Sequence, residues 1–561
     1  MGNPVHSRWG SPLEQYVLYY DKAFLRGHIN LEEDIKSSAR KCIQNIVTIS
    51  EEDDESKVNL LAKQITLAML HSVLLVLLST DGIILLSQPG LICGCIKIMK
   101  TVKVDGAISP FSYEYGYLCF NIAKMALGIC LVEKFHRENI STLLQRIFTE
   151  HQTKDNASIL TEHLSKLYLD EPKGAPHEWR CDWIFGWSDP PAHGGHSGVI
   201  IAESDALDLM DVLWDDRKAF LKSLSLTYTP GSSIIVFLIW QCMIRKGLKG
   251  TPDPLSTIPG LGLFLDLLWR SSLVATPPDY GFIFPMALAA IYQIGKLARS
   301  AVDVEDSHII INRYVKGIQP AENTDIFHEV APLVYHNLLR FVVYNILPGT
   351  ESLFPAFIRS TIGRAWEMIL WEEWDFMPPI GTIAGCFEDL SLFLRFHVPK
   401  LPSQSPVMQA ILQEVVDNDL LGLVGFSIHR LYPNKEPSTS GVYKDLNSCL
   451  EFRDSVRSII VALTRVWTTS TSSPYFIEYT AEWVKHVQYN DILLQMTRQD
   501  NAAGWSAQVT MLKSAWTPAD DFPAVIHDAR TPRGPAILSY AVLRAQLHPS
   551  RSITVAYDAK C

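Results

Sequence analysis

The chain has 561 residues, several times the length of a typical domain, and 47% of them are hydrophobic while only 19% are charged. This composition argues against long disordered tracts. The 49 basic and 60 acidic residues leave a formal charge of −11, which argues against nucleic-acid binding, because phosphate recognition needs clustered Lys and Arg. We therefore expect a large folded chain with no nucleic-acid partner.

The N-terminal residues and the cysteines indicate the compartment. Residues 1–7 contain no basic region followed by an apolar one, so they do not resemble a secretory signal peptide. The 10 cysteines are spread over the whole chain, and many lie in apolar stretches. In a reducing compartment such cysteines act as small buried hydrophobic residues. The sequence predicts a cytoplasmic or nuclear protein that is not secreted.

Helical periodicity begins close to the N-terminus. Ile35, Ala39, Cys42 and Ile46 recur with the spacing of one helix face. The acidic run 51–55 follows, and it suits a solvated linker that continues into the first turn of a helix, where the helix dipole favours negative charge. We expect one helix before this run and another after it.

Residues 64–80 form an apolar stretch without Asp, Glu, Lys or Arg. His71 interrupts the stretch, and its length is near the lower limit for a membrane-spanning helix. The buried helices of a large helical protein contain similar runs. We expect a buried helix here and no membrane contact, with a membrane span or an interfacial helix as the alternatives.

Residues 205–221 are predicted to form a helix with Ser204 as its N-cap. Asp211 and Asp215 share a face of this helix, as a pair of ligands for a divalent cation would. Basic residues follow at once at positions 217 and 218, so we favour a solvated, salt-bridged face. Similar apolar stripes predict further helices in the ranges 326–346, 354–374, 408–431 and 450–466.

Proline and glycine divide the chain into segments of helical length. Breaks occur at Pro230-Gly231, Pro277-Pro278, Pro348-Gly349 and Pro378-Pro379, where proline cannot continue a helix. We predict a mostly α fold, built as a multi-helix α-solenoid or armadillo-like array. No residue signature recurs at a fixed period, so a compact helical domain is the alternative.

The last part of the chain has a different pattern. Its short β-like segments predict a small β-rich appendage of two hairpins at the C-terminus, with helices as the alternative; the segments are 492–497, 507–511, 537–542 and 553–557. The expected organisation is an N-terminal helical unit, a long irregular loop, a main helical body and this appendage, with the boundaries 1–170, 171–203, 204–487 and 488–561.

The loop 171–203 contains the strongest candidate for a metal site: His177, Cys181, His193 and His196. Two ligand pairs with short spacing can supply the four nitrogen and sulfur ligands of tetrahedral zinc. The set holds only one cysteine and lacks a Cys-x-x-Cys pair, so an exposed loop without metal is the alternative reading. Bound zinc could be structural or catalytic.

The sequence contains none of the common catalytic motifs for which we compared it. Phosphate-binding loops, the dinucleotide-binding glycine motif, the nucleophile elbow and the H-E-x-x-H zinc motif are all absent. We therefore assign no catalytic residue. The sequence predicts a scaffold that binds a protein or peptide partner, and the alternative is a metal-dependent enzyme or a zinc-stabilised protein that uses the loop histidines.

Three features of the sequence carry a resemblance to a known group of proteins. The features are helices broken by Pro-Pro and Pro-Gly, a tryptophan-rich stretch at 366–374 and a β-like ending at 553–558. In these the chain resembles helical-repeat proteins of mushroom-forming fungi, some of which carry a MYND-type zinc finger. Only Cys561 lies beyond Cys449, so this chain lacks the cysteines of such a finger. The resemblance implies a helical-repeat fold and assigns no functional residue.

Overall fold

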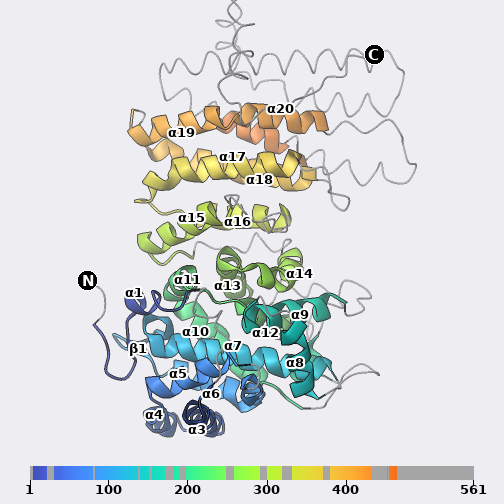
Figure 1. Cartoon of the computed structure of the whole chain (residues 1–561). Helices are drawn as coiled ribbons and strands as arrows, with labels where there is room; N and C mark the ends of the chain where they lie inside the picture. The colour runs from blue at the N-terminus through green and yellow to red at the C-terminus, as the bar shows by residue number, and fades with distance from the viewer. Residues whose placement is uncertain are drawn as a thin grey trace, which may run out of the picture. The chain divides into compact units, whose positions relative to one another are not determined.

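The computed structural model describes most of the chain up to residue 463, and its described part is mostly helical (Figure 1). The described residues are 4–21, 31–79, 82–136, 139–150, 154–170, 181–188, 198–247, 258, 260–290, 300–318, 332–370, 379–402, 404–430, 451–452 and 454–463. The predicted α class is confirmed. The predicted β-rich appendage at 488–561 lies outside the described residues.

Contacts within the chain divide it into two units, residues 1–418 and residues 419–561. The boundaries predicted near residues 170, 203 and 487 remain predictions. The second unit contains α20 (Leu420–Arg430) and helical residues 451–452 and 454–463. All the other labelled elements belong to the first unit.

The described residues of the first part of the first unit form seven longer helices and a hairpin. Its elements are α1 (Leu13–Tyr16), α3 (Glu33–Ser50), α4 (Glu55–Ala62), α5 (Leu67–Val76), η1 (Ile83–Leu86), α6 (Pro89–Met99), β1 (Lys103–Val104), β2 (Ala107–Ile108), η2 (Pro110–Ser112), α7 (Glu114–Phe135), α8 (Ile140–Glu150), α9 (Asn156–Asp170) and η4 (Asp182–Phe185).

The second part of this unit is a succession of helices. Its elements are α10 (Glu203–Asp215), α11 (Arg217–Leu226), α12 (Ser232–Gly247), α13 (Leu261–Val274), η5 (Pro277–Asp279), α14 (Tyr280–Ala290), α15 (Val304–Ile318), α16 (Pro332–Tyr344), η8 (Glu351–Leu353), α17 (Phe354–Leu370), α18 (Pro379–Phe396), η9 (Val398–Lys400) and α19 (Pro406–Asp417).

The predicted helices on either side of the acidic run are confirmed. Ala39, Cys42 and Ile46 are buried along one face of α3. Helix α4 begins at the end of the acidic run, where the Asp54 carboxylate accepts a hydrogen bond from the Ser56 amide at 2.8 Å. The packing of α3 on α6 requires Gly94, because a Cβ at this position would lie 2.1 Å from the Ile46 carbonyl oxygen.

The apolar residues 64–80 contain the buried helix that we expected, and the helix is shorter than the apolar run. Helix α5 has only 10 residues and meets α4 at an angle of 79°. Among the described helices, α7 is a long apolar helix that the sequence did not predict. By length and composition α7 could cross a membrane, but its apolar stretch is completely buried, as in the core helix of a soluble protein.

Helix α7 lies at the centre of the first part of the unit (Figure 1). It contacts α5, α6, α9 and α12, so segments far apart in the sequence pack on one helix. Every residue from Glu114 to Val132 is buried. The apolar faces of the surrounding helices therefore share this one helix as their core.

A β-hairpin precedes α7, and the sequence analysis did not predict it. Strands β1 and β2 are antiparallel, with Lys103 opposite Ile108 and Val104 opposite Ala107. Asp105 and Gly106 connect the strands with positive φ angles of 50° and 85°. An Asp-Gly pair favours this tight turn, because glycine and, less readily, aspartate accept a left-handed conformation.

The single helix predicted for residues 205–221 is wrong. Helix α10 begins at Glu203 without a side-chain cap, so Ser204 is not the N-cap, and α11 begins again at Arg217. The break lies at Asp216, whose carboxylate accepts hydrogen bonds from the Phe111 amide at 2.8 Å and from Ser109 Oγ at 2.6 Å. These distant partners hold the break.

Salt bridges were predicted for this region, and those of Lys218 are made with another segment of the chain. Lys218 contacts Asp303 at 2.6 Å and Glu305 at 2.8 Å, which come from the start of α15 and the residue before it. The guanidinium of Arg217 lies 4.1 Å from the Trp214 ring and donates to the Ser300 carbonyl. The basic residues thus bind a neighbouring segment of the chain.

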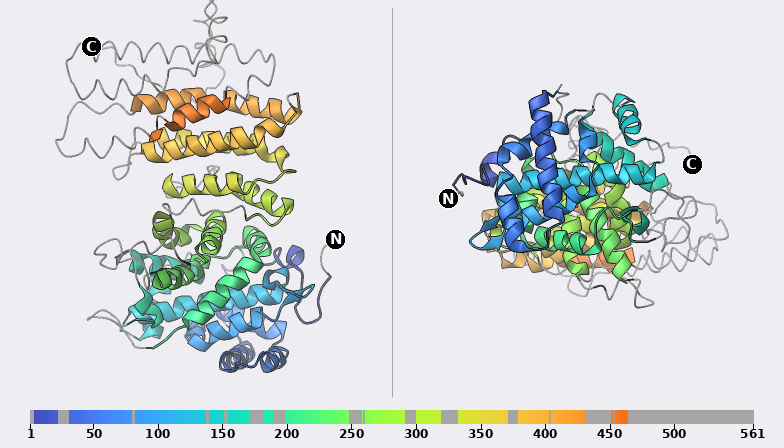
Figure 2. Two further views of the ribbon diagram at one scale, coloured as in Figure 1. Left: turned by 180° about the vertical axis from the view of Figure 1, so that it is seen from behind. Right: turned by 90° about the horizontal axis from the view of Figure 1, so that it is seen from below.

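From α11 to α19 the helices contact one another in a regular order. The odd-numbered helices α11, α13, α15, α17 and α19 contact in succession, and so do the even-numbered helices α12, α14, α16 and α18. Consecutive helices also contact, as in the pairs α13 with α14, α15 with α16 and α17 with α18. The later pairs form successive layers (Figures 1 and 2).

The stripes at 326–346 and 354–374 contain α16 and α17, which confirms helices there. The single helix predicted for 408–431 is wrong, because α19 ends at Asp417 and α20 begins at Leu420. Asp419 has a positive φ of 51°, and its carboxylate accepts a hydrogen bond from the Gly422 amide at 3.0 Å. Aspartate tolerates this conformation better than most residues, so it can separate two apolar stripes.

Candidate functional site

The predicted zinc site falls mostly outside the part of the chain that the structure describes. His177, His193 and His196 are not among the described residues, so the prediction stays untested. Cys181 is described and is buried, and its backbone amide donates to Gln241 Oε1 at 2.9 Å. Within the described ranges, no group of three or more His, Cys, Asp or Glu side chains is arranged to hold a metal ion.

The segment that begins at Cys181 is fixed to α12 by charge. Arg245 on α12 contacts Asp182 Oδ2 at 2.6 Å and Glu203 Oε1 at 2.5 Å. The other oxygen of Asp182 accepts a hydrogen bond from Ser188 Oγ at 2.9 Å. Both carboxylate oxygens therefore have protein partners, and Asp182 anchors the predicted loop 171–203 on α12 at a point within the loop.

A cluster of acid, imidazole and phenol groups lies at the start of α7. Glu114 Oε1 accepts a hydrogen bond from the Tyr20 hydroxyl at 2.6 Å and lies 3.0 Å from His71 Nε2. Its second oxygen accepts a long hydrogen bond from the Ser11 amide at 3.4 Å. The three side chains come from the N-terminal segment, from α5 and from α7.

The protonation states in this cluster follow from its hydrogen bonds. Burial raises the pKa of Glu114, but the bonds from His71 and Tyr20 outweigh this effect, so the pKa lies below its ordinary value. Burial and the adjacent carboxylate raise the pKa of the Tyr20 phenol. Glu114 is therefore ionised and Tyr20 protonated near neutral pH.

The chemistry available to this cluster is limited by its geometry. The His71 side chain is 38% exposed, so its ring reaches the solvent while Nε2 faces Glu114. The hydroxyl beside the ring belongs to Tyr20, 3.5 Å from Nε2, and its proton is donated to Glu114. The cluster thus links the N-terminal segment to α5 and α7, and the described residues place no nucleophile beside the imidazole. The signal in the sequence was the histidine within an apolar run.

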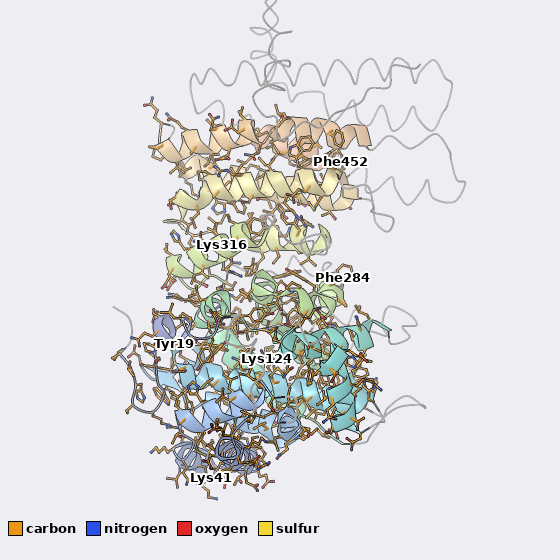
Figure 3. The ribbon with its side chains drawn as sticks, viewed as in Figure 1. Tyr19, Lys41, Lys124, Phe284, Lys316 and Phe452 are labelled. Carbon is orange, nitrogen blue, oxygen red and sulfur yellow. The ribbon has the colours of Figure 1, made fainter. Side chains whose placement is uncertain are left out.

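Lys124 is buried in the middle of α7 (Figure 3). Its Nζ atom donates hydrogen bonds to Asn121 Oδ1 at 3.0 Å and to the Pro230 carbonyl at 2.7 Å. Burial lowers the pKa of Lys124 to about 8, and the charges of Asp279 and Asp155 oppose this effect. The ammonium group holds the turn before α12 against α7.

Asp279 holds the same turn from the other side. One of its carboxylate oxygens accepts hydrogen bonds from the Gly231 amide at 3.0 Å, from the Ser233 amide at 3.1 Å and from Ser233 Oγ at 2.6 Å. The other oxygen accepts from Thr276, and the two residues form a capping box at the start of η5. The turn is therefore held by buried charges of both signs.

Helices α13 and α15 are joined by a completely buried ion pair. Arg270 makes two hydrogen bonds to Asp306, each of 2.8 Å, and neither side chain is exposed to solvent. Arg270 Nε also contacts Asp266 at 2.8 Å. A guanidinium with two carboxylates in this fork arrangement is a strong and directional contact.

A second ion pair joins α16 and α18. Arg340 Nε donates to Asp389 Oδ1 at 2.8 Å, and Asp389 is completely buried. His336 Nε2 lies 3.1 Å from the other carboxylate oxygen without the angle of a hydrogen bond. Gly385 allows this approach, because a Cβ at this position would lie 2.2 Å from the same nitrogen. A third pair, Arg359 with Glu414, joins α17 to α19.

No protein-family model, curated protein sequence or solved structure matches the chain. The function must therefore be argued from the helix arrangement and from the side-chain clusters themselves.

Proposed function

We propose that the protein is an interaction scaffold of helical-repeat type, whose first unit contains an α-solenoid that binds a protein or peptide partner. The observation that carries the proposal is the order of helix contacts from α11 to α19. Each helix packs on a helix two places away along the chain, and α13 with α14, α15 with α16 and α17 with α18 also pack as sequence neighbours. Helix pairs in an α-solenoid pack in this order, and their stacking produces extended binding surfaces.

Three ion pairs support this proposal, because they connect successive layers of the helices α11–α19, called the array below. Arg270–Asp306 is completely buried, whereas Arg359 is largely exposed. Arg270 with Asp306, Arg340 with Asp389 and Arg359 with Glu414 each join helices two places apart in the order. A charge pair with little freedom fixes how one helix lies on the next. A surface held in place in this way loses less conformational entropy when a partner binds.

The ends of α16 and α18 supply the surface that we propose for the partner. Tyr344 and Phe396 are their last residues, with exposed fractions of 41% and 56%. The two helices contact each other, and exposed aromatic residues are enriched among the residues that contribute most to binding. The net charge of −11 favours a partner with a basic patch.

Partner capture with matched variants tests this function. The full chain should co-purify a stoichiometric partner, and the double variant Tyr344→Asp, Phe396→Asp should lose it. Leu60→Asp is the matched control, because Leu60 is 62% exposed on α4, outside the array. Capture of no partner would contradict the scaffold function, and equal capture by the double variant would contradict the proposed surface.

The alternative function is a metal-dependent enzyme or a zinc-stabilised protein that uses His177, Cys181, His193 and His196. The observation that favours it is the anchoring of Cys181 and Asp182 on α12, which fixes the loop 171–203 at one of the candidate ligands. Elemental analysis of the detergent-free protein tests it. About one zinc per chain that is lost in the variant His193→Ala, His196→Ala would support this function, and an unchanged metal content would remove both histidines as ligands.

We also propose a cytoplasmic or nuclear location and a relationship to the fungal helical-repeat proteins that the sequence resembles. The location is supported by the eight cysteines that the structure describes. All eight are free thiols, and seven of them are buried. Free thiols are typical of a reducing compartment. Fractionation of cells that produce a tagged chain would test the location, and recovery from the medium would contradict it.

A further inference from the structure

Two histidines face each other where the end of α7 meets α9. His136 directly follows α7 as its C-cap residue, and His163 lies in the middle of α9. Their Nε2 atoms are 3.0 Å apart. Both side chains are half-buried, and the two helices contact each other directly.

The ring geometry shows how the nitrogens are placed. The ring centroids are 5.2 Å apart, while the Nε2 atoms are only 3.0 Å apart, so both nitrogens lie between the rings. One ring donates a hydrogen bond from its Nε2–H group, and Nε2 of the other ring accepts this bond, because two donors cannot bond to each other. At least one imidazole is therefore neutral and presents a nitrogen lone pair.

We propose that His136 and His163 together bind a divalent transition-metal ion of the zinc class. Zinc–nitrogen bonds of about 2.0–2.1 Å, at angles between those of octahedral and tetrahedral geometry, place two ligand nitrogens roughly 2.9–3.4 Å apart. The observed separation of 3.0 Å lies in this range. The ring nitrogens of neutral histidine are the commonest metal ligands in proteins.

Metal binding requires both imidazole rings to rotate and one ring to change its tautomer. The ion lies to one side of the line between the nitrogens, so each half-buried ring turns about its χ2 angle. The Nε2 proton of the donor ring is lost to water, and Nδ1 of that ring takes up a proton. When both rings are neutral, no net proton is released.

Water completes the coordination in this proposal. Within the described ranges, no third His, Cys, Asp or Glu side chain is placed to bind the same ion, so the described residues supply two ligands. A site with open positions exchanges its metal readily and can polarise a bound water molecule or carbonyl group. The pair shares no residue with the predicted loop site.

Titration of the full chain with Zn²⁺ alone, followed by calorimetry, tests the proposal. The wild-type chain should bind zinc, and His163→Asn should weaken the binding by about tenfold or more, because one of two ligands is removed. His308→Asn is the matched control, since His308 on α15 contacts the Gly349 carbonyl and has no histidine partner there. This control should bind zinc as tightly as the wild type.

A thermal melting measurement shows whether the histidine variants still fold. Zinc should raise the melting temperature of the wild type but not that of His163→Asn or His136→Asn, while all three melt cooperatively without metal. Unchanged zinc affinity in both variants would overturn the proposal. Retained binding in His163→Asn together with loss in His193→Ala, His196→Ala would also overturn it and would assign the metal to the loop.

Discussion

Two regions of the first unit bury polar groups in different ways. Around α7, Lys124 and Glu114 make hydrogen bonds to turns and to the N-terminal segment, including backbone atoms. In the array, Arg270 and Arg340 pair with carboxylates on the helix two places along. The first arrangement attaches irregular segments to a central helix, whereas the second ties equivalent helices to one another. The difference shows that α7 is the common packing partner of the segments around it, whereas the helices α11–α19 are held together by contacts from one layer to the next.

The largest effect is expected from breaking the ion pair between α13 and α15. Arg270→Ala should lower the free energy of unfolding by about 3–5 kcal/mol, because it leaves Asp266 and Asp306 buried without their counterion. Arg359→Ala is the control, since its side chain is 59% exposed, and it should cost less than about 1 kcal/mol. Urea unfolding followed by circular dichroism measures both. Equal losses would mean that burial does not distinguish the two pairs.

The corresponding change in the α7 region is Lys124→Met. The variant keeps the length of the side chain but leaves the Pro230 carbonyl and the Asn121 oxygen without their donor, at a cost of about 1–3 kcal/mol for each unsatisfied group. Lys41→Met at an exposed position of α3 is the control and should change stability by no more than about 0.5 kcal/mol. A neutral result for Lys124→Met would show that this buried charge does not stabilise the turn.

The pH dependence of the same residue gives a second test. The pKa of Lys124 is about 8 in the folded state, below its ordinary value. Between this pH and the ordinary pKa of lysine the unfolded chain binds the proton and the folded chain does not, so stability should rise with pH over this interval. The rise should be absent in Lys124→Met when both proteins are unfolded in urea at several pH values.

The packing between α16 and α18 can be tested by replacing each of two glycines of α18 separately with alanine. Gly385→Ala should destabilise the array by about 1–3 kcal/mol, because the new Cβ would clash with His336. Gly381→Ala meets nothing within 4 Å and should be neutral or stabilising by up to about 1 kcal/mol. Melting temperatures of the two variants decide the comparison, and a stabilising Gly385→Ala would show that the layers can separate without cost.

A further test is the pH dependence of stability at the break between α10 and α11. Burial raises the pKa of Asp216 to about 7, although hydrogen bonds from Ser109 and Phe111 oppose the shift. Above the ordinary aspartate pKa the folded chain retains this proton longer than the unfolded chain does. Stability should therefore fall as the pH rises to about 7, by up to about 1.4 kcal/mol per pH unit.

Asp216→Asn should remove this dependence. Asparagine can accept from the Phe111 amide and donate to Ser109 Oγ, so the contact itself can be kept. Chemical denaturation between pH 4 and pH 8 compares the variant with the wild type. An unchanged slope would show that another group titrates in this interval.

The candidate sites show the limit of prediction from sequence. Apolar spacing alone placed Ala39, Cys42 and Ile46 on a buried face, and it did so because helix periodicity is a local property. No local rule pairs Glu114 with His71 or His136 with His163, because each pair is formed by helices that meet only after folding. The loop histidines at 177, 193 and 196 were prominent in the sequence, and they lie outside the described residues.

The sequence by itself determined the α class, the acidic linker after α3 and the stripes that became α16 and α17, since periodicity and capping act over a few residues. Only the tertiary structure decided the helix breaks that no proline marks, such as the one at Asp216, and which charges pair. Asp216 ends a helix within an unbroken apolar stripe because its carboxylate binds an amide about a hundred residues earlier in the chain. Arg270 selects Asp306 because the stacking of α13 on α15 removes both from water, where an unpaired charge is costly.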